Sequence, residues 1–328
     1  MHVLLTHSPF TLAGCRFMKS AAFGAAAWVV SLSLVRPDLA TAAILLAALV
    51  LVPLAMPLLL LPSPLAGEGP GVRGRLHHAA AMLCRIASLL QPWAAVLLLP
   101  AFVLPQGLTA GLLALPWTAV TVLLAACGVL RFVGRKQLAA DTLAHDAGLV
   151  MLLVGGTFTF MTRMGWQPLG FEPAIIRLTA VHFHYAGFVL PVLAGLAARE
   201  TRGATSTFMV VGIVVGMPLV ALGIIFSRPL ELAAVIGLTS ACTLVAIRYF
   251  GLAARAPDAI SFTLFSISAA SLSAAMLFAP LYAWGRFTGS PWLQISDMLP
   301  SHGACNAFGF ALCGLLAWQW GRRGSERR

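Results

Sequence analysis

Charged side chains are scarce in this sequence. Asp, Glu, Lys and Arg make up 9% of the 328 residues, and hydrophobic residues make up 60%, whereas a soluble domain carries about 25% charged residues. A soluble fold of this length could not bury so much apolar surface, so we expect the surrounding medium to be a lipid bilayer. The apolar runs are long and do not alternate in polarity, which does not fit the short strands of a membrane barrel. The composition therefore predicts an all-α fold, a polytopic transmembrane helical bundle.

The sequence also lacks the short motifs of soluble enzymes. It contains no Walker-type phosphate loop, no GxSxG, no HExxH and no CxxCH, which gives no support to the chemistry of a soluble enzyme and favours a protein that is not an enzyme. None of the six cysteines forms a CxxC pair, which favours free thiols in the core. The net charge of +11 comes from basic residues in small groups between apolar runs, so we expect the bilayer, and not nucleic acid, as the partner.

Ten apolar runs are long enough to be membrane helices. They predict a single integral membrane domain over residues 1–328, preceded by an N-terminal extension at 1–19 and interrupted by a cytoplasmic loop at 62–78 that is rich in Pro and Gly. The expected spans lie near residues 20–35, 41–61, 84–104, 108–130, 145–162, 174–197, 206–227, 231–250, 260–283 and 302–320.

The basic residues give the orientation. With ten crossings both termini share one side, and that side then holds most of the 21 Lys and Arg residues. The other side keeps five: Arg36, Arg163, Arg177, Arg228 and Arg286. Because basic residues are retained in the cytoplasm, both termini are predicted to be cytoplasmic.

Acidic residues are missing from the middle of the spans. All ten lie at or near predicted helix ends. This argues against a carboxylate proton relay and against a bare divalent metal site in the core, so no metal and no cofactor are expected. Polar groups deep in the bilayer must therefore be sought among histidines.

The stretch LTAVHFHYAGFVLP, residues 178–191, places two histidines and a tyrosine inside an apolar run. A helix starting after Glu172 and Pro173 puts His184 about 15 Å below the outer surface, near the middle of a core roughly 30 Å thick. His182 and Tyr185 are three residues apart and share one helix face, while Arg177 and His184 are seven apart and share another. Glu172, Arg177, His182, His184 and Tyr185 are thus candidate substrate-binding residues, with no catalytic role assigned.

A second polar group lies in the last span, in PSHGACNAFGFALCG. His302 and Asn306 are one helical turn apart on one face, and both belong to the outer half of the membrane. They join the candidate site if the sixth and tenth spans are neighbours. The alternative interpretation is that all these side chains form interhelical hydrogen bonds, worth about 0.6 kcal/mol each.

Two of these segments carry a resemblance to a known family. TAVHFHYAGF followed by LP, with the later HGACNAFGFALCGLLAW, resembles the bacterial YndJ-like membrane proteins. The resemblance implies a multi-pass protein of the bacterial cytoplasmic (inner) membrane. The family has no settled activity, and the loose description of its members as transporters implies no substrate. The N-terminal extension and the 62–78 segment depart from the family pattern.

Three functions fit the sequence. The first is binding or transport of an unknown small solute through an outward-facing site that contains histidine. The alternative is a membrane protein that binds haem or copper, with His184 and His302 as metal ligands. The third is a structural or assembly factor without a ligand.

Overall fold

The computed structural model describes the backbone of residues 9–59 and 72–326 and the side chains of residues 18–59 and 72–322. The described residues are almost entirely helical and contain no strand. The polytopic helical bundle predicted from composition is therefore confirmed. The candidate membrane spans number eight by length and hydropathy, and a shorter apolar helix covers Met18–Leu34.

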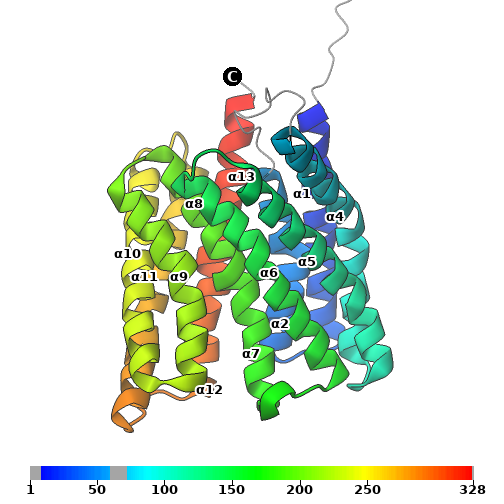
Figure 1. The fold of residues 1–328 in the computed structure, drawn as a ribbon, viewed down its shortest axis with the longest axis vertical. Helices are drawn as coiled ribbons and strands as arrows, with labels where there is room; N and C mark the ends of the chain where they lie inside the picture. The colour runs from blue at the N-terminus through cyan, green and yellow to red at the C-terminus, as the bar shows by residue number, and fades with distance from the viewer. Residues whose placement is uncertain (1–8, 60–71, 327–328) are drawn as a thin grey trace, which may run out of the picture.

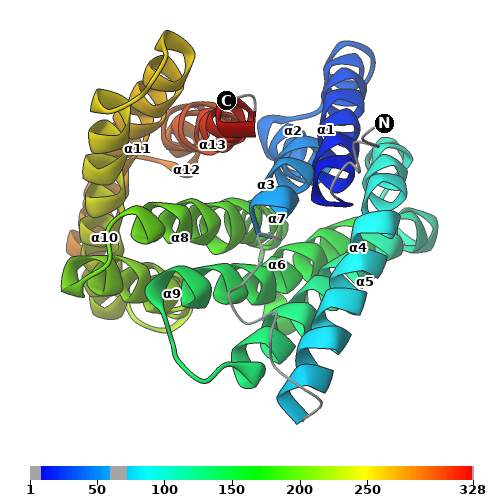
Figure 2. The same ribbon diagram turned by 90° about the horizontal axis from the view of Figure 1, so that it is seen from above.

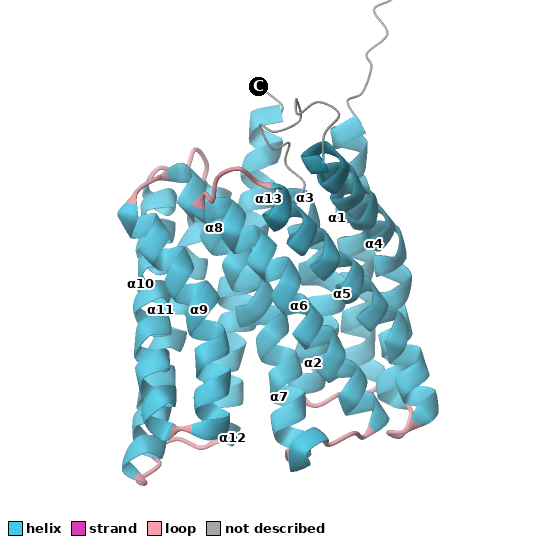
Figure 3. Ribbon diagram, viewed as in Figure 1, coloured by secondary structure: helices cyan, strands magenta, loops and turns pink. Residues whose placement is uncertain are grey.

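Ten helices cross the bundle, some of them in several segments (Figures 1 and 3). They are α1 (Pro9–Leu34); α2 (Leu39–Leu46), η1 (Ala47–Leu51) and α3 (Val52–Leu59); α4 (Val72–Val103); α5 (Leu108–Gly134); α6 (Ala140–Met164); α7 (Pro173–His184), η3 (Tyr185–Val189) and α8 (Leu190–Glu200); α9 (Ala204–Phe226); α10 (Arg228–Ala254); α11 (Ala259–Thr288); and α12 (Ile295–Met298), η4 (Leu299–Gly303), η5 (Cys305–Leu312) and α13 (Cys313–Glu326). A single 3-10 turn, η2 (Pro168–Gly170), precedes α7.

Two predicted boundaries need correction. The segment 1–19 was expected to be an extension, but α1 begins at Pro9, so residues 9–19 form its first turns. The segment 62–78 was expected to be a loop, but α4 begins at Val72, so residues 72–78 are helical. The remainder of both segments, residues 1–8 and 62–71, lies outside the described residues.

The ends of the helices separate the basic residues as expected. The helices run alternately up and down, so α1 begins and α13 ends at the same end of the bundle (Figure 1). The end that carries η2 and α12 is the one predicted to face outward, and we call it the outer end. The other end is called the cytoplasmic end.

The helices form two groups around a shared centre (Figure 2). In one group α4 packs on α5 and α5 on α6, and in the other α10 packs on both α9 and α11. Three segmented helices lie between them: the second (residues 39–59), the sixth (173–200) and the tenth (295–326). The second helix contacts the sixth and tenth through α2 with α7 and α3 with α13, and the sixth contacts the tenth through η3 with η5.

Each of these three central helices contains a π turn beside a proline. A proline lacks the N–H that would bond to the carbonyl four residues earlier, and its ring crowds that carbonyl. Pro53 follows η1 and Pro191 follows η3, while Pro300 lies inside η4. The prolines therefore explain why the regular α-helical hydrogen bonds give way to π-helical ones at these places.

Polar side chains from neighbouring helices bond to backbone carbonyls in and near the π turns. Gln91 of α4 donates to the carbonyl of Ala48 at 2.7 Å, and Ser268 of α11 donates to that of Phe310 at 2.9 Å. Both side chains are buried, and buried carbonyls need such partners in an apolar medium. These bonds join the outer groups of helices to the centre.

Candidate functional site

His184, the deepest candidate, is fully buried between helices. Its Nδ1 lies 2.7 Å from the carbonyl of Ala180 and therefore carries the proton that it donates. Its Nε2 then accepts a hydrogen bond of 3.0 Å from the indole N–H of Trp117 on α5. The two rings are stacked with centroids 5.8 Å apart. Both ring nitrogens of His184 thus have protein partners.

A glycine on α6 makes room for this ring. A Cβ atom at Gly155 would lie 2.7 Å from Nδ1 of His184, closer than side chains allow. The imidazole therefore occupies the space that a side chain on α6 would take. His184 joins α5, α6 and α7 and presents no free nitrogen to a ligand.

Tyr185 is also buried and bound to backbone. Its hydroxyl donates to the carbonyl of Ala43 on α2 at 3.0 Å. Tyr185 is also the first residue of the π turn η3. The bond links the sixth helix to the second at the depth of the candidate site. Its polar atom is therefore occupied within the protein.

Arg177 and Glu172 lie at the outer end of α7, away from the histidines' ring atoms. Nη1 of Arg177 forms an ion pair of 2.6 Å with Oδ2 of Asp38, and Oδ1 of Asp38 accepts the backbone N–H of Thr41 at the start of α2. Glu172 precedes Pro173 at the first turn of α7, as predicted, and its side chain is exposed. The charge of Arg177 is thus paired with that of Asp38, the residue that precedes α2.

His182 differs from His184 in that its Nε2 has no hydrogen-bond partner among the described residues. Its Nδ1 lies 2.8 Å from the carbonyl of Leu178, one turn back, and donates to it. Its side chain is exposed, and among the described residues nothing bonds to its Nε2. Residues two apart on a helix point about 200° away from each other around its axis, which explains why one histidine is buried and the other is exposed.

His302 and Asn306 form a hydrogen-bonded pair on the tenth helix. Nδ1 of His302 donates to the carbonyl of Ala275 on α11 at 2.9 Å, which leaves Nε2 to accept from Nδ2 of Asn306 at 3.1 Å. Nδ2 of Asn306 also donates to the carbonyl of His302 at 2.9 Å. The amide oxygen of Asn306 has no hydrogen-bond partner among the described residues, and both side chains are half-buried.

His182 of the sixth helix and His302 of the tenth lie near one another, where these two helices adjoin through η3 and η5. They lie close enough for their charges to interact, although 120 residues of chain separate them. The structure thus brings His182, His302 and Asn306 together from the sixth and tenth helices, and we call this group the central histidine site. It leaves His184, Tyr185, Arg177 and Glu172 outside the group.

Sequence reasoning missed a buried charge cluster at the cytoplasmic end. Asp146 of α6 forms ion pairs of 2.9 Å with both Arg131 and Arg135, and Asp141 pairs with Arg199 of α8 at 3.0 Å. The signal in the sequence is that Arg131, Arg135 and Lys136 are followed within 131–146 by Asp141 and Asp146. The cluster ties α5, α6 and α8 together, and among the described residues no three His, Cys, Asp or Glu side chains could hold a metal ion.

Comparison with known proteins decides the family. The model of the family "YndJ-like protein" matches residues 42–310, which is most of the chain and includes both segments that form the central histidine site. The chain belongs to the YndJ-like family. A similar curated protein is the "Uncharacterized membrane protein YndJ" of Bacillus subtilis (strain 168), which is 34% identical over 208 residues.

The match with that relative is partial on both sides. It covers 63% of this YndJ-like chain and 38% of the Bacillus protein, so the chain spans less than two fifths of its relative's length. No solved structure matches the chain. The family resemblance inferred from the two segments is confirmed, and this chain is a multi-pass membrane protein.

Proposed function

We propose that this YndJ-like protein binds or carries a small solute at the central histidine site, through an opening on the outer side of the bacterial cytoplasmic membrane. The observation that supports this best is the exposed side chain of His182, whose Nε2 has no hydrogen-bond partner among the described residues, close to the His302 and Asn306 pair. An uncompensated polar atom deep in a bilayer costs free energy, so such groups commonly mark a solute path.

The hydrogen bonds at the site favour one kind of solute. His182 offers a free nitrogen lone pair and Asn306 a free amide oxygen, and both are acceptors. The described residues place no ion pair at this site. A solute that presents N–H or O–H donors therefore fits better than a carboxylate or phosphate, which would meet acceptors.

The cytoplasmic half of the tenth helix is held to the second helix by hydrogen bonds. Gln319 of α13 donates to the carbonyl of Leu54 at 2.7 Å, and Arg322 donates to that of Pro57 at 2.8 Å. These bonds join the tenth helix to the second below the histidines. A carrier in its outward-facing state has this arrangement, with a sealed inner side and an accessible site above it.

Accessibility of position 182 tests the proposal. In a background with all six cysteines replaced by alanine, His182→Cys should react with a membrane-impermeant, positively charged methanethiosulfonate added to the outside of intact cells. Leu277→Cys is the matched control, because Leu277 of α11 is 68% exposed and lies a similar number of residues from the outer end of its helix as His182 does. Absence of reaction at position 182 under conditions that label an outer-loop cysteine would contradict the proposal.

A search for the solute uses the same variants. Purified protein in lipid nanodiscs should gain thermal stability with some donor-rich solutes, such as amines or polyols, and His182→Ala and His302→Ala should both lose that gain while keeping normal unfolding temperatures. An absorbance spectrum tests the haem alternative. A Soret band that His184→Ala removes would replace the solute proposal, since Nε2 of His184 would then have to leave Trp117.

A further inference from the structure

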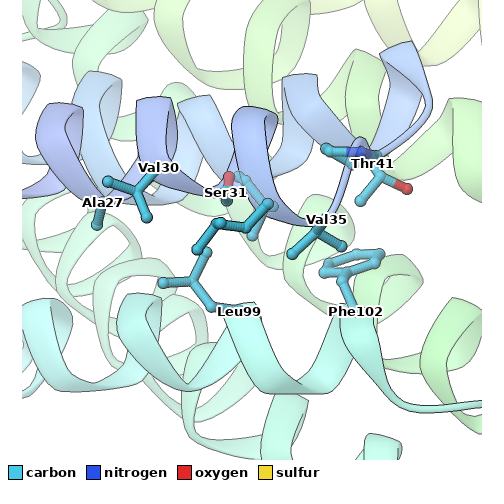
Figure 4. Close-up of a pocket in the computed structure, with 10 residues that line it drawn as sticks. Ala27, Val30, Ser31, Val35, Thr41, Leu99 and Phe102 are labelled. Atoms are coloured by element: carbon cyan, nitrogen blue, oxygen red, sulfur yellow. The ribbon is translucent and has the colours of Figure 1, made fainter.

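Two pockets adjoin one another at the outer end of the bundle, around α1, α2 and α4 and away from the central histidine site. The larger has a volume of about 460 Å³ and lies between the α1–α2 turn and the ends of α4, α6 and α7. The smaller, of about 170 Å³, lies between α1, α2 and α4 (Figure 4). Both are lined by Val35, Pro37, Thr41 and Phe102, so one opens beside the other.

The larger pocket contains a buried cation. Arg163 is 7% exposed and lines this pocket. Its Nε and Nη2 donate to the carbonyls of Ala101 and Leu104 at 2.9 and 2.7 Å, and its guanidinium lies 5.0 Å from the centre of the Phe102 ring. Within the described part of the chain no carboxylate lies within ion-pair distance of Arg163.

The other charges of this pocket compensate one another. Asp38 and Arg177 both line it and are paired at 2.6 Å. The charge of Arg163 is therefore the one without a counter-ion, and within the described residues only carbonyl dipoles and the face of the Phe102 ring offset it. A buried charge without a counter-ion is costly, so an anion entering this pocket would be stabilised by it.

The smaller pocket is apolar. Its lining includes Ala27 and Val30 of α1 and Leu99 of α4, whose side chains face one another across the space in Figure 4. Its one serine, Ser31, donates its hydroxyl to the carbonyl of Trp28 at 2.7 Å. Val30 is exposed, so the pocket opens at the surface of the bundle. A dry cavity of about 150 Å³ accommodates a molecule the size of benzene, which corresponds here to about six carbons of an alkyl chain.

We propose that these two pockets form one binding site for an amphiphile with an anionic head, carboxylate or phosphate, and an alkyl chain. The head would lie against Arg163 in the larger pocket, and the chain would lie between α1 and α4. Charge complementarity at Arg163 and the contact of a polar with an apolar pocket support this choice of ligand. The proposal is independent of the proposed function, because His182, His302 and Asn306 line neither pocket.

Three small probes separate the two halves of the ligand. Octanoate carries both head and chain, acetate carries only the head, and 1-octanol carries only the chain. Binding is measured by isothermal titration calorimetry with the full chain in nanodiscs of phosphatidylcholine. We expect octanoate to bind about tenfold or more tightly than either other probe, as a charge-assisted hydrogen bond and a buried chain each contribute.

Variants locate the site. Ala27→Phe fills the smaller pocket and should weaken octanoate binding about tenfold, whereas Ala26→Phe, whose side chain is exposed on the same helix, should leave it unchanged. Asp38→Asn removes the negative charge of the larger pocket and should strengthen binding. Arg163→Gln should abolish binding. If Arg163→Gln does not fold, the Ala27 and Asp38 variants still decide the matter.

The outcomes are distinct. Equal binding of octanoate and 1-octanol would overturn the role of Arg163, and equal binding of octanoate and acetate would overturn the role of the apolar pocket. No octanoate binding, or binding that Ala27→Phe leaves intact, would overturn the site altogether. Repeating the titration in nanodiscs of phosphatidylglycerol distinguishes the source of the head group: competition by this lipid assigns the site to a phospholipid phosphate, and its absence assigns it to a free carboxylate amphiphile.

Discussion

The indole N–H of Trp117 on α5 donates a hydrogen bond of 3.0 Å to Nε2 of His184 on α7, at the most buried point of the HFHY segment. The bond fixes the tautomer of His184 and fills its last acceptor. It makes His184 a link between helices, whereas His182, two residues earlier, keeps an accessible nitrogen.

Removing either partner of this bond should lower stability. We expect Trp117→Phe to cost about 1 kcal/mol, because Nε2 of His184 loses its donor, and His184→Ala to cost about 2–4 kcal/mol, because it also leaves a cavity. Denaturant unfolding of the purified protein measures both. The double variant should show a coupling of about 1 kcal/mol. Unchanged stability of His184→Ala would contradict the linking role.

Gly155→Ala should damage the same contact from the side of α6. The added Cβ would lie 2.7 Å from Nδ1 of His184, and such overpacking costs about 1–3 kcal/mol. The matched control is Gly237→Ala on α10, where a Cβ would meet nothing within 4 Å. That control should be neutral or stabilising by up to about 1 kcal/mol. Equal unfolding midpoints for the two variants would contradict the prediction, because they would show that α6 can shift enough to accommodate the added Cβ.

Asp146→Asn should be strongly destabilising. Asp146 is 2% exposed and is paired with Arg131 and Arg135, so its neutralisation leaves two cations near the cytoplasmic end without a counter-ion. Breaking a buried pair in this way costs about 3–5 kcal/mol. Glu200→Gln, at an exposed helix end, should change stability by less than about 0.5 kcal/mol. Comparable unfolding curves for both variants would argue that water reaches the cluster.

The orientation is tested by reporter fusions. Fusions after residues 135, 200 and 255 follow the ends of α5, α8 and α10 and should report a cytoplasmic location, because most basic residues lie at that end. Fusions after residues 168 and 290 should report the outside. An inverted result at the outer pair would move the central histidine site to the cytoplasmic face.

The number and order of the helices could be predicted because both depend on local signals. Apolar run length sets each span, and the asymmetry of Lys and Arg fixes the pairing of helix ends. The start of α7 after Glu172 and Pro173 was predicted for the same reason. The starts of α1 and α4 were placed too late, since their first turns, including residues 72–78, carry polar and basic residues that a hydropathy criterion counts as loop.

The candidate site could be predicted only in part, because depth does not reveal hydrogen-bond partners. Both His182 and His184 can be identified from their position in an apolar run, and depth alone favours His184. Its partner Trp117 is 67 residues away in sequence, and no spacing rule connects them. Asp38 was recoverable as the partner of Arg177, because it is the acid between the first two predicted spans on the same side of the membrane.

The contact between α3 and α13 has a consequence for how the chain is made. The second helix is nearly enclosed by protein, yet the side chains that bond to Leu54 and Pro57, Gln319 and Arg322, are synthesised 265 residues later. During translation the second helix therefore lacks these partners until residues 295–326 have been synthesised. Until then it must be surrounded by lipid or by the insertion machinery. A chain released before residue 295 would therefore lack the side chains that bond to these two carbonyls.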